Sequence, residues 1–213
     1  MKKKVIISLL TGFFSLVTLT AQVVETVPLI PPQKTGGMSL LEALNKRQSQ
    51  RSFSKKDITP QELSNLLWAA YGVNRPNGFR TAPTAKNWFE YDIYIIKPEG
   101  WYLYEPVKHA LLKMGNEDLR EYSATQDFAK TAPVNLIFVA DFDRMTNSDD
   151  ATRQFFSATD VGYISQNVYL YCASAGLATI VRGQIDKAKA HEALKLRPNQ
   201  RVILAQTVGY PGE

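Results

Sequence analysis

The chain has 213 residues, 45% of them hydrophobic and 11% aromatic, which is enough to bury the core of one domain of ordinary size. Its 25 Lys and Arg residues against 20 Asp and Glu give a net charge of +5, but three of the lysines lie within the first four residues. Without those three, 22 basic residues stand against 20 acidic ones, and neither a basic stripe nor a repeated Arg/Lys motif remains. The composition therefore argues against nucleic acid as a partner.

The first 21 residues have the pattern of a secretory signal peptide. Lys2, Lys3 and Lys4 precede an uncharged, mostly apolar run over 5–20, and Ala21 provides a small residue at its end. An uncleaved membrane anchor is the alternative, because about 20 apolar residues would span a bilayer. Polar residues dilute the run and no basic cluster follows it, which favours cleavage after Ala21. We therefore expect export, to the periplasm, with membrane contact only if the leader stays attached.

Cysteine and histidine usage limits the chemistry that the chain can perform. Cys172 is the only cysteine, so no intramolecular disulfide can form, and its neighbours indicate a buried thiol in the core. The two histidines, His109 and His191, are remote from each other in the sequence. We expect neither a cysteine nucleophile nor a metal site.

The elements expected after the leader begin with an irregular segment. Residues 22–38 contain three prolines and a Gly-Gly pair, which predicts an extended arm of the kind that wraps a partner. Ser39 and Glu42 form a capping-box pattern that opens a short helix running into Arg47. The run 59–62, Thr-Pro-Gln-Glu, is a second capping box and opens a helix that Gly72 closes.

Residues 73–89 show no regular hydrophobic period and are expected to form a long loop. Loops of that length inside a compact domain are usually functional, so this loop is a candidate for part of the site.

The next runs predict a sheet. Residues 91–96 and 101–104 are rich in β-branched and aromatic residues and are joined by a turn ending in Gly100, and a short helix is expected from Val107. Three further apolar runs are too continuous to be half exposed and are expected to be central strands, in a sheet covered on both faces: 134–140, 177–181 and 202–208.

Residues 150–175 predict one long helix that Gly176 terminates. A stripe of apolar residues runs along one face of it, namely Val161, Ile164, Val168, Cys172 and Ala175. A helix of about 25 residues would be nearly 40 Å long, which exceeds the diameter of a small domain. Its other faces still carry large apolar side chains that a dimer interface would bury, namely Phe155, Phe156, Tyr163, Tyr169 and Leu170.

The segment Arg47-Gln48-Ser49-Gln50-Arg51 carries the strongest chemical signal. In extended backbone, residues at i, i+2 and i+4 point the same way, so two guanidinium groups and a hydroxyl would face one ligand. Forked cationic donors with a hydroxyl suit a phosphate monoester. A solvated basic turn is the alternative interpretation of the same residues.

Together with Phe53, this segment resembles the opening motif of the nitroreductase family, Arg-x-Ser-x-Arg-x-Phe. The run 80–87, Arg-Thr-Ala-Pro-Thr-Ala-Lys-Asn, resembles the loop that lies beside the flavin ring in that family. Three more segments resemble the SagB-type, or thiazole/oxazole oxidase-like, dehydrogenase branch: 100–111, 160–177 and 208–211. The resemblance spans residues 39–211.

The resemblance implies an α+β fold, with a mostly antiparallel central sheet flanked by helices and a long helix at a dimer interface, over residues 39–213. It also implies FMN as cofactor. Carried over residue by residue, it assigns Arg47, Gln48, Ser49 and Arg51 to the phosphate and ribityl chain, and Thr84, Ala85 and Asn87 to the isoalloxazine ring. Arg182-Gly183 would present a backbone N–H to flavin N5. Since family sites lie between two protomers, we expect an obligate homodimer.

The expected activity is ping-pong hydride transfer between a small-molecule substrate and an unidentified electron donor or acceptor. No side chain stands out as a general acid or base, so no catalytic residue is assigned. Reduced nicotinamides are scarce outside the cytoplasm, which favours another donor or a dehydrogenase direction. A non-catalytic flavin-binding or envelope interaction protein is the main alternative. Oxidation of peptide azolines is a third, and it would need a companion peptide and cyclase.

Overall fold

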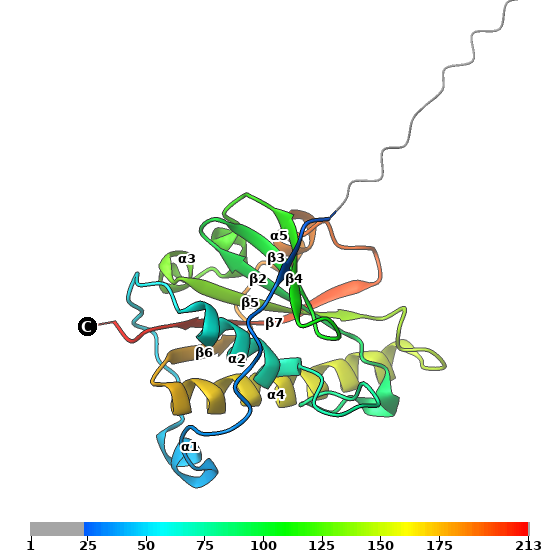
Figure 1. Ribbon diagram of the computed structural model, residues 1–213. Helices are drawn as coiled ribbons and strands as arrows, with labels where there is room; N and C mark the ends of the chain where they lie inside the picture. Colours follow the sequence, from blue (N-terminus) through cyan, green and yellow to red (C-terminus); the bar gives the residue numbers. More distant parts are fainter. Residues whose placement is uncertain (1–23, 213) are drawn as a thin grey trace, which may run out of the picture.

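A computed structural model describes residues 24–212, so the leader expected at 1–21 lies outside the described residues. The chain forms an α+β fold on one seven-stranded sheet in the order β1-β4-β3-β2-β5-β7-β6 (Figure 1). Every neighbouring pair of strands is antiparallel. The expected sheet is therefore confirmed. Within residues 24–212, no helix combines the length and the apolar character needed to cross a membrane.

The strands largely coincide with the apolar runs of the sequence. Lys97 pairs with Gly100, so Pro98 and Glu99 form a tight two-residue turn, and Gly100 has a φ of 144° that few other residues adopt. All eight residues of β5 are buried, as expected for a central strand. The strands are β1 Thr26–Pro28, β2 Tyr91–Lys97, β3 Gly100–Glu105, β4 Ala110–Gly115, β5 Val134–Asp141, β6 Ala178–Arg182 and β7 Gln200–Gly209.

The helices begin and end where the capping residues predict. Both capping boxes form, with Ser39 and Thr59 as N-caps, and Gly176 ends the long helix in the left-handed conformation at φ 69°. The helices are α1 Leu40–Lys46, α2 Pro60–Tyr71, α3 Asp127–Thr131, α4 Asp150–Ala175 and α5 Lys187–Ala193, with short 3₁₀ turns η1 Ala85–Asn87 and η2 Arg120–Ser123.

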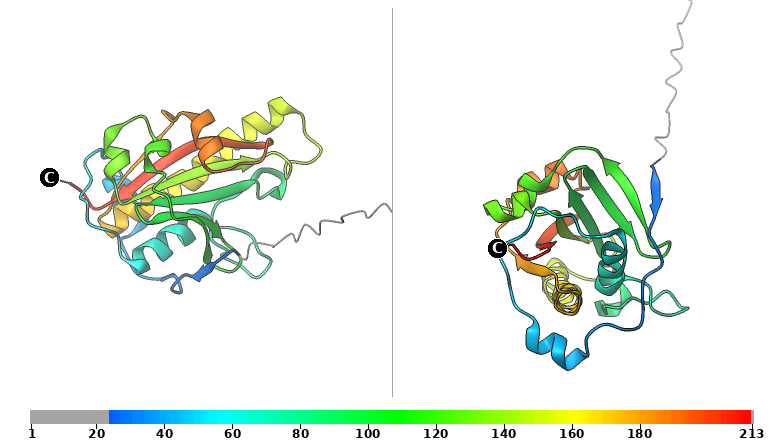
Figure 2. Two further views of the ribbon diagram at one scale, coloured as in Figure 1. Left: turned by 90° about the horizontal axis from the view of Figure 1, so that it is seen from above. Right: turned by 60° about the vertical axis from the view of Figure 1, so that its left-hand side comes forward.

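Two apolar cores, one on each face of the sheet, hold the layers together. On one face, α2 and α4 pack over β2, β5 and β7. On the other face, α5 and η2 cover the same strands. The sheet is therefore covered on both faces, as expected. In the right-hand view of Figure 2, α4 is seen nearly end-on, with α1 on its far side from the sheet.

Three expectations about regular structure are wrong in detail. No helix begins at Val107; a turn leads into β4, because Leu111 and Leu112 pair with β3 and extend the sheet. The run 177–181 is not central, since β6 pairs only with β7 and lies at the sheet edge. The arm is not wholly irregular, because residues 26–28 pair with β4 as β1.

The arm also lies against its own chain. The Leu29 N–H donates to the His109 carbonyl at 3.1 Å, and the Gln33 N–H donates to Asn65 Oδ1 at 2.8 Å. These bonds attach the segment to β4 and α2. Whether a partner also contacts it stays a prediction.

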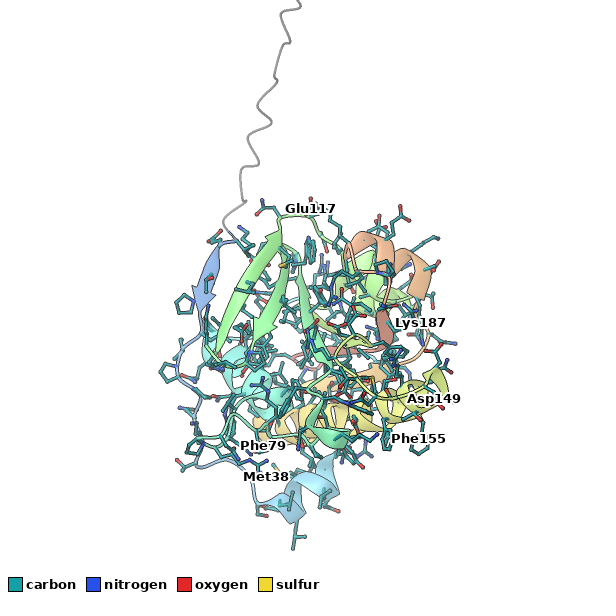
Figure 3. All side chains as sticks on the ribbon, turned by 90° about the vertical axis from the view of Figure 1, so that its right-hand side faces the viewer. Met38, Phe79, Glu117, Asp149, Phe155 and Lys187 are labelled. Carbon is teal, nitrogen blue, oxygen red and sulfur yellow. The ribbon has the colours of Figure 1, made fainter. Side chains whose placement is uncertain are left out.

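Helix α4 buries the expected stripe but not all of its other apolar side chains. Val161, Ile164, Val168 and Cys172 are buried, and the thiol of Cys172 lies in the core as predicted. Phe155 remains 64% exposed and lies at the periphery of the molecule in Figure 3. Tyr169 differs from the expectation, because the chain itself buries it to 7% exposure without a dimer.

Candidate functional site

The basic segment at 47–51 lies along the free edge of the sheet. Helix α1 ends as the Arg47 N–H donates to the Ala43 carbonyl, and the chain then continues in extended form. The Gln50 N–H donates to the Thr179 carbonyl on β6 at 3.0 Å. Because an edge strand has unpaired backbone groups on its outer side, this bond helps to satisfy β6 and fixes the segment beside it.

Tyr169 of α4 joins the segment to β6. Its hydroxyl lies 2.8 Å from Ser49 Oγ and accepts a hydrogen bond from the Val181 N–H at 3.0 Å. The guanidinium of Arg47 lies over the Tyr169 ring, 5.3 Å from its centroid. Sequence reasoning missed this role, because a tyrosine on an apolar helix gives no sign of which residues its hydroxyl will reach.

A cleft of about 420 Å³ opens between α1, α4 and β6. Lys46 and Arg47 make its wall cationic, and within residues 24–212 neither forms an ion pair with a carboxylate. Hydrogen bonds from Ser39 and the charge of Lys46 lower the pKa of Glu42, which lies one helical turn before Lys46, so Arg47 is the cation of this wall without a carboxylate neighbour among residues 24–212. Together with the amide side chains beside it, Arg47 suits an anionic group such as a phosphate. The cleft is lined by Asn45, Lys46, Arg47, Gln48, Gln50, Tyr169, Cys172, Ala173, Gly176, Leu177, Thr179 and Pro211.

The four residues assigned to the phosphate and ribityl chain do not all face this cleft. Arg47 and Gln48 line the cleft, whereas Ser49 does not line it and is hydrogen-bonded to Tyr169, which does. Arg51 is exposed and is not part of the lining. The roles of these four residues stay predictions.

The residues assigned to the flavin ring lie in a separate, tightly bonded turn. The Ala85 N–H donates to Asp160 Oδ2 of α4 at 2.7 Å, and the Phe89 N–H donates to Thr84 Oγ1 at 3.2 Å. Lys86, Asn87 and Phe89 have positive φ angles of 51°, 55° and 48°, which non-glycine residues rarely adopt. Backbone strain of this kind is often found at functional sites.

A second cleft, of about 300 Å³, borders this turn on its outer side. It is lined by Arg75, Asn77, Phe79, Arg80, Ala82, Pro83, Thr84, Asn87 and Phe89. Thr84 and Asn87 therefore face a cavity, whereas Ala85 is bonded to α4 by its N–H.

Arg182 and Gly183 lie at the end of β6 that is remote from the first cleft. The Arg182 side chain is buried and donates to the Ser123 carbonyl, Asn135 Oδ1 and Thr207 Oγ1 at 2.7, 2.9 and 3.1 Å. Burial lowers the pKa of this guanidinium to about 10. Only the backbone of this pair is thus free to meet a ligand. A Cβ added at Gly183 would meet only Leu204, at 3.8 Å, so the chain itself leaves open space there.

A single chain does not bring the predicted residues into one cavity. The first and second clefts share no lining residue. Asp160, which holds the turn, and Tyr169, which holds the basic segment, are nine residues apart on α4, a rise of about 13.5 Å. One chain therefore places the two groups of predicted residues in separate cavities, and whether one ligand contacts both stays a prediction.

Two buried carboxyl groups near the turn also escaped the sequence assignment. Glu90 is 0% exposed and Asp160 is 2% exposed. Burial and the neighbouring Asp160 raise the pKa of Glu90 to about 8, and burial also raises the pKa of Asp160. Within residues 24–212, no three His, Cys, Asp or Glu side chains gather as a metal site would require.

Comparison with known proteins finds relatives in both sequence and fold. Residues 44–210 match the sequence model described as the nitroreductase family. A protein of Methanocaldococcus jannaschii, provisionally named a nitroreductase, is 32% identical over 170 residues, which cover 75% of this chain and 86% of that protein.

Solved structures agree with this match. A provisionally named nitroreductase from Ralstonia eutropha JMP134 is 40% identical, with a TM-score of 0.84 over 88% of this chain and 90% of that one. An NADPH:FMN oxidoreductase from Vibrio harveyi, solved with NAD⁺, is 19% identical, with a TM-score of 0.62 over 82% of this chain and 69% of that one. At that identity the second likeness shows the fold alone.

Proposed function

Because the chain belongs to the nitroreductase family, we propose that this oxidoreductase uses FMN and transfers hydride by a ping-pong cycle through flavin N5. The observation that carries the proposal is the cationic cleft beside β6, in which Arg47 has no carboxylate partner within the described residues. We place the cofactor's phosphate in this cleft. The likeness to the fold of an NADPH:FMN oxidoreductase is consistent with FMN as the cofactor.

The residues present fit such a cofactor at both ends of β6. Arg47 and Gln48 would hold the phosphate, with Arg51 adding positive charge from the surface. From Thr179 in the cleft to Gly183 the strand advances by about 13 Å. Backbone groups of alternate residues face outward along an edge strand, and Thr179 and Val181 do so here. Continuing the alternation turns the Gly183 N–H to the same side, where the open space would admit a ring.

A second copy of the chain would complete the site. We assign Thr84, Ala85 and Asn87 to the flavin of a partner chain, because in one chain they face a different cleft from Arg47. Large apolar side chains stand exposed on the two helices nearest the site, with Leu41 of α1 at 77% and Tyr163 of α4 at 46%. A homodimer would remove them from water.

In this arrangement the cofactor supplies the hydride-carrying atom, and the chain binds, orients and shields it. Arg47 would fix the phosphate, the end of β6 would direct a backbone N–H to the ring, and the 84–87 turn would limit access to it. No side chain is assigned a proton-transfer role in the chemical step.

We further propose that the protein acts outside the cytoplasm, where reduced nicotinamides are scarce, so that either another donor or an organic substrate reduces the flavin. The alternative is a non-catalytic protein that binds FMN in the cell envelope. Turnover separates the two: an enzyme passes many equivalents of electrons from a donor to an acceptor per bound flavin, whereas a binding protein does so no faster than free FMN.

The test is an FMN titration of the protein purified after expression of the full chain. Replacing Arg47 by Ala removes a charge-assisted contact worth roughly 1.5–3 kcal/mol, so affinity should fall about tenfold to a hundredfold. Arg201→Ala is the matched control, since Arg201 is exposed on β7 and is not part of the cleft lining. A protein that binds no FMN, or an Arg47→Ala variant that binds as tightly as the control, would overturn the proposal.

A further inference from the structure

Glu90 and Asp160 form a buried pair of carboxyl groups that the proposed chemistry does not use. Glu90 lies immediately before β2, and Asp160 lies near the middle of α4. Their side chains lie within hydrogen-bonding reach of each other. Two carboxylates are both acceptors, so a bond between them requires a proton. Without that proton, no side chain among residues 24–212 donates to either Glu90 oxygen, and the hydrogen bonding that favours the charged form comes from the residue's own backbone N–H.

No cation among residues 24–212 is bonded to Glu90 to stabilise its charged form. The positive charge of Arg144 favours the charged form of Glu90, but its guanidinium donates to Asp92 at 2.6 Å and forms an ion pair with Asp141 at 3.1 Å. Arg80 lies over the rings of Tyr71 and Phe89, 5.5 Å from each centroid, and its two buried nitrogens without partners among the described residues, Nε and Nη1, do not donate to Glu90. A carboxyl group buried without a committed cation keeps its proton, because the charged form would be poorly solvated.

Two tyrosines complete the surroundings of the pair. The Tyr91 hydroxyl donates to the Ser157 carbonyl, so its proton is not available to donate to the carboxyl pair. The Tyr71 hydroxyl on α2 is buried and has no hydrogen-bond partner among the described residues. Burial and the neighbouring Glu90 raise the pKa of Tyr71, so this hydroxyl stays neutral over the physiological range.

Asp160 also fixes the 84–87 turn, which contains Thr84 and Asn87. Its Oδ2 accepts from the Ala85 N–H at 2.7 Å, and three of the next four residues have positive φ angles. A turn in such an unfavourable conformation persists only where its surroundings fix it. A change in the protonation of the carboxyl pair therefore reaches the turn through the hydrogen bond between Asp160 and the Ala85 N–H.

We propose that Glu90 and Asp160 share one proton, that this proton holds the 84–87 turn on α4, and that the flavin-facing turn loosens as rising pH favours loss of the proton. Both are positioning residues, because they act through the turn and not on the reacting atoms. The consequence for flavin binding rests on the proposed function, whereas the proton-linked order of the turn does not.

The direction of the effect follows from the raised pKa of Glu90, about 8 in the folded protein against 4.5 for an ordinary glutamate. The ordered turn retains the proton that a loosened turn would release. Order is therefore greatest below about pH 4.5, falls progressively between about 4.5 and 8, and changes little above that.

The experiment is amide hydrogen exchange of the FMN-free protein, following the peptide that contains Ala85, after correction for the intrinsic pH dependence of exchange. We expect protection of the wild-type turn to fall by about tenfold or more between pH 5.5 and 7.5, since one linked proton gives up to tenfold per unit. Glu90→Gln carries a permanent amide donor of the same shape, so its protection should change less than about twofold beyond the control.

Glu99→Gln serves as the matched control, because Glu99 is an acidic residue in the exposed β2–β3 turn, and it should behave as wild type. Asp160→Asn is a second test variant. An asparagine can donate to Glu90 without a shared proton, so protection of the turn should depend less on pH than in the wild type. A wild-type turn whose protection does not change with pH, or a Glu90→Gln variant with the wild-type profile, would overturn the proposal.

The two proposals fail separately. The exchange experiment needs no flavin, so a pH-dependent turn in a protein that never binds FMN would refute the proposed function and leave the proton-sharing pair standing. Tight FMN binding with a pH-independent turn would do the reverse.

Discussion

Replacing Tyr169 by Phe tests whether one hydroxyl organises the proposed phosphate cleft. That hydroxyl accepts the Val181 N–H and bonds Ser49, so its loss removes two hydrogen bonds at once. The ring remains, and with it the packing under Arg47. The change is therefore confined to hydrogen bonding.

The expected cost comes mainly from Val181. Its N–H lies on the outer edge of β6, where no further strand among residues 24–212 can accept it. A partly buried donor left without an acceptor costs about 1–3 kcal/mol, whereas Ser49 is exposed and can bond to water. We expect the free energy of unfolding to fall by about 1–2 kcal/mol.

Equilibrium unfolding in urea measures this change, and an FMN titration of the same variant measures its effect on the cleft. The basic segment loses its attachment through Ser49, so affinity should fall several-fold. Tyr163→Phe is the matched control, because Tyr163 lies on the same helix, its side chain is 46% exposed, and its hydroxyl forms no hydrogen bond within residues 24–212. The reasoning is refuted if Tyr169→Phe and Tyr163→Phe unfold at the same denaturant concentration with equal slopes.

Three further predictions concern other parts of the molecule. Gly183→Ala should leave the free energy of unfolding unchanged or raise it by up to about 1 kcal/mol, because the added Cβ meets only Leu204 at 3.8 Å, yet it should weaken FMN binding measured by fluorescence quenching. Equal FMN affinity in wild type and variant would exclude a close approach there. Because the pKa of Glu90 is raised in the folded protein, the free energy of unfolding of the wild type should fall by as much as about 1.4 kcal/mol per pH unit between about pH 4.5 and 8. Urea titrations at several pH values measure this slope, and Glu90→Gln should remove it. Ser64→Ala should cost about 1–3 kcal/mol and expose the arm to limited proteolysis, since Ser64 Oγ donates to the Ile30 carbonyl and bonds His109 Nε2 at 2.8 Å; an arm cleaved no faster than in wild type would contradict this role.

The candidate site shows how far residue patterns reach. Two guanidinium groups and a hydroxyl at alternate positions singled out the segment at 47–51, the family resemblance decided between a phosphate site and a solvated turn, and Arg47 and Gln48 do line a cationic cleft. Asp160 and Tyr169 were not found, because a helical sequence does not reveal which loop or strand its polar groups will meet. Asp160 bonds Ala85, 75 residues earlier in the chain, and Tyr169 bonds Ser49, 120 residues earlier.

The sequence by itself determined the elements whose signals are local. Both capping boxes, the stop at Gly176 and the tight turn before Gly100 depend on residues within a few positions of each other, and each forms as predicted. The eight buried residues of β5 follow from a continuous apolar run in the same way. Short-range hydrogen bonding and periodic apolar burial suffice for such elements.

Only the tertiary structure decided where the remaining segments lie. Leu111 and Leu112 could have formed a helix, but pairing with β3 satisfies their backbone and extends the sheet. The strand at 178–182 looks central by composition, yet it forms the edge that the basic segment and Tyr169 cover. Hydrogen bonds and burial between distant segments made these choices, and they depend on contacts that no local pattern encodes.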